Sequence, residues 1–245
     1  SVMRVLGWDS TSPASMTAAF WGARESCRRS RETVSTEMWE AMNTTWNLIS
    51  NGKLQRYRPH QACQLIRERC AVINGIADST MSHDQGWLFM VLGRSIERVD
   101  MTARMIESAA YNVDSPDAWT QTLRACGAHH AFVRTYRGLA TDQQAAEFLL
   151  LDRLFPRSVV FSLDQAESCL TNLDVGERRA GFTGEAMRVL GQARAHLEYT
   201  PLSEILTDLP ARMTQLQRTC SQANDAIARR YFEGANPITW HAGVR

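Results

Sequence analysis

Apolar residues recur along most of the chain at intervals of three and four positions, the period of one face of an α-helix. The longest stripe covers residues 83–110, and its apolar positions come close to a heptad repeat. No segment alternates between apolar and polar residues over a useful length, so we predict no strand. The pattern predicts an all-α fold, an antiparallel multi-helix bundle of about eight helices joined by short links. The other helical segments are residues 13–32, 35–50, 59–77, 117–137, 141–173, 183–199 and 208–232.

Capping residues mark where these helices begin and end. A Ser, Thr or Asp before an apolar stripe satisfies the first free backbone N–H groups, and proline fits the first helical position. Pro156 breaks or kinks its helix, because proline lacks an N–H group. Gly127 and Gly138 leave open whether residues 117–137 form one kinked helix or two. The predicted start signals are Ser12-Pro13, Ser35, Pro59, Ser82 with Gln85, Ser115-Pro116, Thr141 with Gln144, and Thr183.

The domain organisation follows from the links between the helices. We find no linker rich enough in Pro, Gly or Ser to divide the chain. Residues 174–183 form a polar loop that contains glycine, and residues 234–245 an irregular tail. We therefore expect a single helical bundle domain over residues 1–245.

Charge and hydropathy narrow the classes of partner. The formal net charge is +1, from 27 basic and 26 acidic residues, so no global field draws the chain to nucleic acid or to an anionic membrane. No apolar run approaches the length of a membrane span, about 18 residues. Lys53 is the only lysine, so the basic residues are almost all arginine. Arginine offers a planar fork suited to carboxylate or phosphate.

The six cysteines lack the spacing of a metal or redox site. Cys63 and Cys70 are the nearest pair, seven positions apart on one face of a helix, and no Cys-x-x-Cys occurs. We expect reduced, mostly buried thiols and a cytoplasmic protein.

Other enzyme signatures are also missing from the sequence. None of the six histidines has a glutamate three positions before it, so a di-iron bundle site is not predicted. The phosphate-binding Gly-x-x-x-x-Gly-Lys, the dinucleotide Gly-x-Gly-x-x-Gly and the Gly-x-Ser-x-Gly elbow do not occur. We predict no metal site, assign no catalytic residue and expect no cofactor in this chain.

What remains is a set of charged residues beside the apolar stripes. In the 83–110 helix, Arg94, Glu97 and Arg104 form a second stripe next to the apolar one, and Asp100 can pair with Arg104 at i, i+4. A solvated, salt-bridged helix face is the simplest interpretation. Charges that border a buried stripe must all be satisfied, however, and such networks are commoner where a ligand binds.

Two segments of the chain are alike. Phe89 to Arg94 is similar to Phe148 to Arg153, and each is followed four residues later by another arginine, Arg98 or Arg157. The match has two possible explanations. It arises by chance in a chain rich in Arg and Leu, or it reflects two equivalent helices. The second interpretation predicts that the four arginines approach one cleft, where Glu97 accepts a hydrogen bond from an arginine of another helix. Asp84, at the start of the 83–110 helix, is either a capping carboxylate or part of this site.

Several motifs in the same order resemble the alpha-E domain family of bacterial proteins. They are Ser35-Thr36-Glu37-Met38-Trp39-Glu40 with Asn43, Thr80 to Trp87 running into Leu92 to Arg98, Gly127-Ala128-His129 with Arg134 to Gly138, and Glu147 to Val159. The resemblance covers about residues 12–244. Family members usually begin with a further helix that carries Gly-Arg and Glu-Arg, so we expect the N-terminus of the domain to be incomplete here.

The resemblance implies a function through the proteins that accompany this family. Its members are similar to proteins encoded beside, or fused to, circularly permuted ATP-grasp ligases, and transglutaminase-like proteases often accompany them. This implies a helical accessory subunit that holds a peptide or small acidic substrate for an amide ligase, with ATP and Mg on the partner ligase. The alternatives are a stand-alone enzyme of amide-bond metabolism that uses Glu97 or Glu37 as general acid or base, and a purely structural interaction module. The candidate ligand-binding residues are Arg24, Glu37, Asn43, Asp84, Arg94, Glu97, Arg98, Arg104, Asp152, Arg153 and Arg157.

Overall fold

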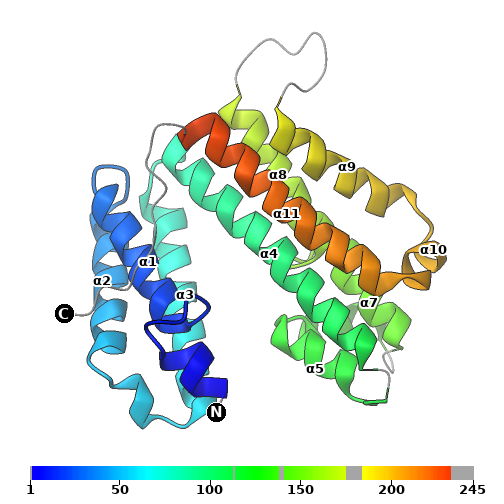
Figure 1. Ribbon diagram of the computed structural model, residues 1–245, viewed down its shortest axis with the longest axis horizontal. Coiled ribbons are helices and arrows are strands. Elements are labelled where there is room, and N and C mark those ends of the chain that lie inside the picture. Colours follow the sequence, from blue (N-terminus) through cyan, green and yellow to red (C-terminus); the bar gives the residue numbers. More distant parts are fainter. Residues whose placement is uncertain (1, 113, 138–140, 175–183, 233–245) are drawn as a thin grey trace. The chain divides into compact units, whose positions relative to one another are not determined.

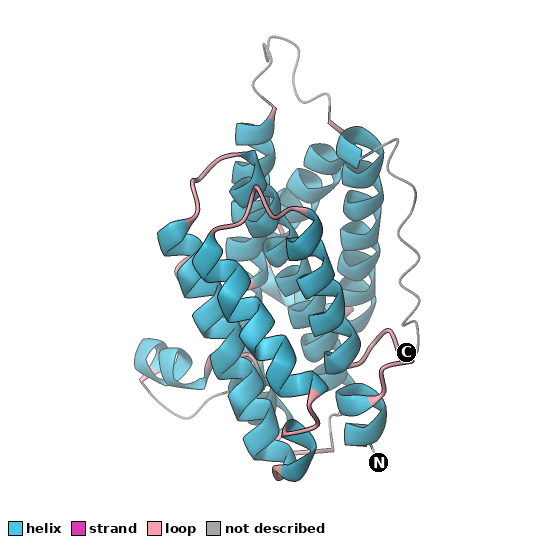
Figure 2. Cartoon of the chain, turned by 90° about the vertical axis from the view of Figure 1, so that its left-hand side faces the viewer, coloured by secondary structure: helices cyan, strands magenta, loops and turns pink. Residues whose placement is uncertain are grey.

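The computed structural model describes residues 2–112, 114–137, 141–174 and 184–232. Every regular element in these ranges is a helix, as Figure 2 shows, so the predicted all-α class is confirmed. The contacts divide the described residues into two compact units, one up to Trp87 and one from Leu88 onward. Each unit is considered by itself below.

The first unit is built on three helices that lie side by side in Figure 1. The central helix α2 packs against both α1 and α3. Arg69 of α3 ties the pair together, because its Nε donates to Oγ1 of Thr45 in α2 at 2.9 Å. The core consists of the apolar stripes predicted from the sequence, with Phe20, Met42 and Ile73 among the buried side chains. The elements are η1 (Met3–Trp8, a π-helix), α1 (Met16–Arg29), α2 (Thr36–Ser50), η2 (Leu54–Arg56, a 3₁₀ turn) and α3 (Pro59–Thr80).

The second unit is organised around α9, which packs against both α8 and α11, while α5 packs against α7. The long α4 reaches α11 through Glu107, which accepts hydrogen bonds from Thr214 at 2.7 Å and from Gln217 at 2.6 Å. These two bonds lower the pKa of Glu107. The helices are α4 (Gln85–Tyr111), α5 (Ala118–Ala125), α6 (His129–Tyr136), α7 (Asp142–Leu151), α8 (Val159–Leu173), α9 (Glu185–Tyr199), α10 (Leu202–Thr207) and α11 (Leu209–Phe232).

Most predicted helix boundaries are confirmed. The Oγ of Ser35 accepts from the backbone N–H of Met38, Pro59 opens α3, and Thr141 with Gln144 forms a capping box. Pro156 breaks the helix, and Ser158 caps its continuation, α8. Residues 117–137 form two helices rather than one, separated by Gly127, whose φ of +66° suits glycine.

Three predicted caps are wrong. Asp117, not Ser115, is the N-cap residue of α5, because residues 115–118 form a turn ahead of the helix. Ser15, not Ser12, caps α1 through its Oγ, because residues 9–15 form turns and Pro13 lies within them. Asp84, not Ser82, caps α4: its Oδ1 accepts from the N–H groups of Gly86 at 2.9 Å and Trp87 at 3.4 Å. Thr183, the predicted tail and almost all of the predicted 174–183 loop lie outside the described residues.

In the ranges that the structure describes, no helix is both long enough and apolar enough to cross a bilayer. Eleven α-helices are present there instead of about eight, since two predicted segments are each divided and the short α10 is added.

The cysteines should differ sharply in reactivity. Cys63 and Cys70 on α3 are exposed, whereas burial raises the pKa of the other four thiols, to about 11 for Cys126 and about 12 for Cys220. The thiolate is the reactive form. We expect iodoacetamide at about pH 8 to label the two α3 cysteines of the folded protein, and all six after unfolding. Mass spectrometry checks this, and rapid labelling of Cys126 in the folded state would contradict it.

Candidate functional site

Two of the predicted binding residues meet between α1 and α2. Nε of Arg24 donates to Oδ1 of Asn43 at 2.9 Å, and its Nη1 pairs with Glu25 at 2.9 Å. The guanidinium lies over the ring of Trp39, 5.5 Å from the ring centroid. These residues, Arg24, Glu25, Trp39 and Asn43, form the Arg24 cluster. The Arg24 side chain keeps 25% of its surface exposed, so it is fixed in orientation and still reachable by a ligand.

Trp39 is the member of the cluster whose role the sequence did not reveal. Trp39 was not among the candidate residues, and its side chain is only partly buried. A second guanidinium, that of Arg31, also lies over its ring, at 5.6 Å from the centroid. Contacts of this kind orient a cation over an aromatic face. Glu37 is exposed in the first turn of α2, where its charge suits the positive end of the helix dipole.

One candidate of α4, Arg98, meets the turn between α7 and α8, together with Thr102. Nη1 of Arg98 approaches the carbonyl oxygen of Pro156 at 3.5 Å, and Oγ1 of Thr102 donates to the carbonyl oxygen of Arg157 at 3.1 Å. Asp152 shapes this turn, since its Oδ1 accepts from the N–H groups of Leu154 and Phe155 at 2.9 and 2.7 Å. Asp152 therefore has a structural role, as Asp84 has at the start of α4.

Arg94 and Arg153 have other neighbours. Arg153 pairs with Glu198 of α9 at 2.8 Å. The charge of Arg94 opposes the effect of burial on the pKa of Cys169 in α8. Arg98 and Arg153 therefore bond different elements, and the convergence of the four arginines on one cleft stays a prediction.

Glu97 lies with Asp100 and Arg104 on the α4 surface. Arg104 bonds Asp100 through Nε at 2.7 Å, and this bond raises the pKa of Arg104. Glu97 is exposed. Burial is the largest cause of the raised pKa of Cys220, and the charges of Asp100 and Glu97 raise it further. Both carboxylates therefore lie toward α11, which carries Cys220. The expected hydrogen bond from an arginine of another helix to Glu97 is not among the contacts of the described residues.

A chain of ion pairs that was not predicted runs across α8 and α9. Arg194 bonds Glu167 through Nε at 2.5 Å and Glu198 through Nη1 at 2.5 Å, and Glu198 also holds Arg153. The bond to Glu167 is the largest cause of the raised pKa of Arg194. The i, i+4 spacing of Arg194 and Glu198 is visible in the sequence, whereas the contact with Glu167 depends on how α8 packs on α9.

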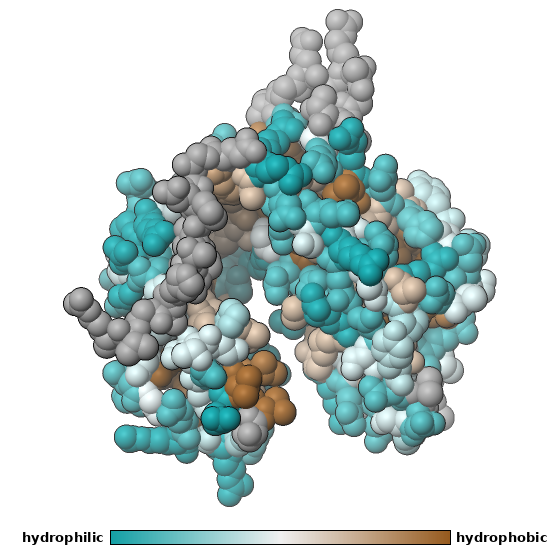
Figure 3. Space-filling view, viewed as in Figure 1, coloured by the Kyte–Doolittle hydropathy of each residue, from teal (hydrophilic) through white to brown (hydrophobic). Residues whose placement is uncertain are grey.

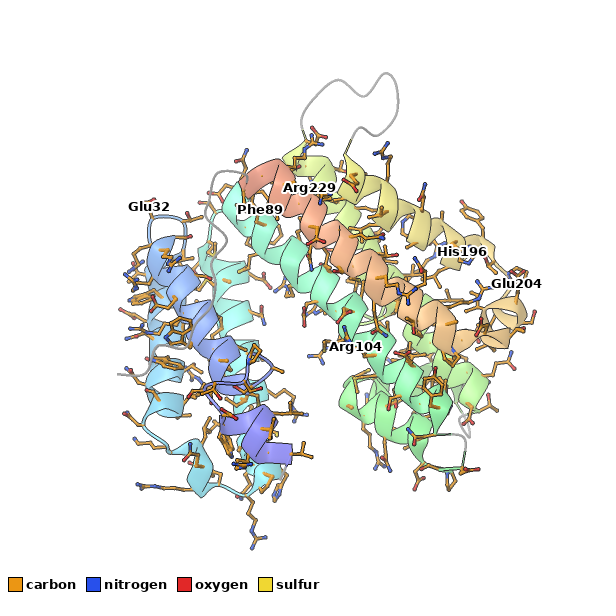
Figure 4. All side chains as sticks on the ribbon, in the orientation of Figure 1. Glu32, Phe89, Arg104, His196, Glu204 and Arg229 are labelled. Atoms are coloured by element: carbon orange, nitrogen blue, oxygen red, sulfur yellow. The ribbon has the colours of Figure 1, made fainter. Side chains whose placement is uncertain are left out.

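A cavity of about 280 Å³ lies between α9 and α11, and its lining includes His196 and Arg212, neither of which was a candidate. Figure 4 shows His196 on α9 and Glu204 on α10 at the same end of this helix pair. Arg212 bonds both of them. A second cavity, of about 330 Å³, lies beside α4 and α5 and has Ser108, Asn112 and Gln121 in its lining. Neither lining contains an aspartate or a glutamate. The described residues hold no cluster of three His, Cys, Asp or Glu side chains that could bind a metal.

The fold and these contacts define an all-helical protein with oriented arginines on its helix surfaces. It belongs to the Alpha-E family, described as a predicted alpha-helical domain with a conserved ER motif, whose model matches residues 1–232. Glu97-Arg98 in α4 and Glu68-Arg69 in α3 are two Glu-Arg pairs of this chain. The resemblance seen in the motifs is thereby confirmed.

Mycobacterial proteins are similar to this chain. Uncharacterized protein Mb2597 of Mycobacterium bovis is 25% identical over 183 residues, which are 67% of this chain and 20% of the relative. Uncharacterized protein Rv2567 of Mycobacterium tuberculosis is 26% identical over 149 residues, 54% of this chain and 17% of the relative. The chain thus spans about a fifth of the length of these curated relatives. No solved structure matches it.

Proposed function

We propose that this chain is a helical accessory subunit of a circularly permuted ATP-grasp amide ligase, and that it holds a peptide or small acidic substrate. ATP and Mg bind to the partner ligase, and the complex works in the cytoplasm. A transglutaminase-like protease that cleaves the product is a second partner. The motifs that resemble the alpha-E family suggest these partners, and the Arg24 cluster supports the binding role.

The observation that carries the proposal is the fixed orientation of Arg24. Asn43 and Glu25 occupy two of its donor positions, and Trp39 holds the plane of the guanidinium. Arginine has five N–H donors in a fork that matches a carboxylate. A cation held in this way loses little conformational entropy when it binds an anion. The cost of ordering the arginine side chain therefore weakens binding less than it would for a mobile arginine.

The two alternatives receive less support from the contacts. A stand-alone enzyme would place a carboxylate in a closed pocket, whereas Glu37 and Glu97 are both exposed. A purely structural module would not need an arginine that is oriented and still exposed. Substrate conversion by the isolated chain would favour the enzyme, and binding to the ligase without any effect on turnover would favour the structural module.

The test is co-purification with a circularly permuted ATP-grasp ligase from the same organism, followed by ATP turnover with and without the chain. We expect a stable complex and a turnover that the chain increases. Arg24→Gln should reduce the increase by a factor of about ten, the effect of losing one charge-assisted hydrogen bond. If no complex forms and turnover is the same without the chain, the proposal is wrong.

Arg28→Gln is the matched control. Arg28 lies one turn further along α1 and pairs with the same Glu25, at 2.8 Å, but its side chain is more exposed than that of Arg24. It has no recorded contact with Asn43 or Trp39 among the described residues. We expect Arg28→Gln to leave the increase in turnover unchanged, and equal losses in both variants would show that Arg24 has no special role.

A further inference from the structure

We propose that the cavity between α9 and α11 binds a small carboxylate that carries amide groups, of the size of an amino acid or a dipeptide, with its carboxylate on Arg212. The class of ligand rests on the proposed substrate-holding role. The cavity is a second binding place in the second unit, separate from the Arg24 cluster of the first. The residues that line the cavity include Val189, His196, Leu197, Arg212, Gln215 and Gln222.

Arg212 is held at this cavity from two directions. Its Nη1 lies 2.5 Å from Nε2 of His196 on α9, and its Nη2 lies 3.3 Å from Oε1 of Glu204 on α10. A guanidinium has donors and no acceptor, so Nε2 of His196 accepts and the ring proton is on Nδ1. The histidine therefore orients the arginine without neutralising its charge.

The link to Glu204 leaves Arg212 able to take another anion. The Glu204 side chain is 61% exposed and accepts a single bond at 3.3 Å, whereas 24% of Arg212 is exposed. Exposed pairs of this kind contribute little free energy. Of the five donors of Arg212, the described contacts use two, so the remaining donors can meet a carboxylate.

The rest of the lining fits an amide-bearing ligand. Arg212 is the one formally charged side chain among the lining residues, so the cavity favours an anion. Gln192, Gln215 and Gln222 each offer an amide donor and an acceptor, which is what a peptide group needs. Val189, Ala193, Leu197 and Leu216 give apolar area. In Figure 3 the surface over α9 and α11 is mostly hydrophilic, with small hydrophobic areas between polar side chains.

The volume sets the size of the ligand. About 280 Å³ is at the low end of small-molecule sites. It equals the space of roughly nine water molecules at ~30 Å³ each. This is room for an amino acid or a dipeptide and too little for a nucleotide cofactor.

The experiment measures binding to the full chain without any ligase, by calorimetry and by NMR titration. The probes are the dipeptide glycylglutamine with a free C-terminal carboxylate and the same dipeptide with a C-terminal amide. We expect the free acid to bind at least about tenfold more tightly, because the amide cannot form the paired bond with Arg212. Equal binding of the two probes, or no binding of either at millimolar concentration, would overturn the inference.

Two variants locate the site. Arg212→Gln should bind both probes equally weakly, while Arg229→Gln, which changes an exposed arginine of the same helix that pairs with Glu185, should bind like the unmodified chain. Undiminished preference for the acid in Arg212→Gln would refute the assignment. If Arg212→Gln fails to fold, the comparison of the two probes on the unmodified chain still tests whether the chain prefers the free carboxylate. Binding here without any effect on the ligase would refute the proposed function alone.

Discussion

Replacing Phe148 by alanine is expected to lower the free energy of unfolding of the second unit by about 3–5 kcal/mol, the usual cost of removing a buried phenylalanine. Phe148 of α7 is buried among aromatic rings from α6 and from the turn between α7 and α8. The centroids of Phe132 and Phe155 lie 5.6 and 5.1 Å from its own, and that of Tyr136 lies at 6.3 Å. The neighbouring rings cannot collapse fully into the space that the phenylalanine leaves. The cost of the remaining cavity therefore adds to the lost transfer free energy of the side chain.

Thermal and denaturant unfolding followed by circular dichroism measure this effect. Leu154→Ala is the control, because Leu154 is 88% exposed on the nearby turn and should change stability by at most about 0.5 kcal/mol. A Phe148→Ala variant as stable as Leu154→Ala would show that the aromatic rings do not form a close-packed core in solution.

The sequence predicted the helices because their signals are local. Apolar spacing reports one face of a helix, and the caps at Ser35 and Thr141 involve bonds to backbone groups three residues away. The same local rules failed where two cap residues stand close together. Asp84 and Ser82 both suit the start of α4, and only the turn geometry decides that Asp84 reaches Gly86. The short α10 has six residues, too few for a periodic pattern.

The candidate site was less predictable because it depends on contacts between helices. Arg24 and Asn43 were both candidates, yet nothing in their spacing showed that α1 and α2 would place Nε against Oδ1. Asp152 was also a candidate, and its spacing did not show that it would bond backbone groups of its own turn. Arg212 and His196 were missed, since sixteen positions and a further helix separate them, and each has an ordinary sequence context.

The ion pairs of Arg194 allow a second large effect to be tested. Arg194→Met retains much of the side-chain length and removes the charge. Its partners Glu167 and Glu198 are 16% and 9% exposed, so both carboxylates would lose a partner where water reaches them poorly. Removing one partner of a fully buried ion pair lowers the free energy of unfolding by about 3–5 kcal/mol. Because 30% of the Arg194 side chain is exposed, we expect Arg194→Met to lower it by about 2–3 kcal/mol.

Arg153→Met is the matched comparison for this network. Arg153 also bonds Glu198, but its side chain is 73% exposed, so its loss should cost no more than about 1 kcal/mol. Adding Glu167→Gln to Arg194→Met should restore part of the stability, since the second change removes an unpaired carboxylate. Chemical denaturation of the three variants measures these differences. If Arg194→Met is no less stable than Arg153→Met, the network is an exposed surface arrangement and does not hold α8 against α9.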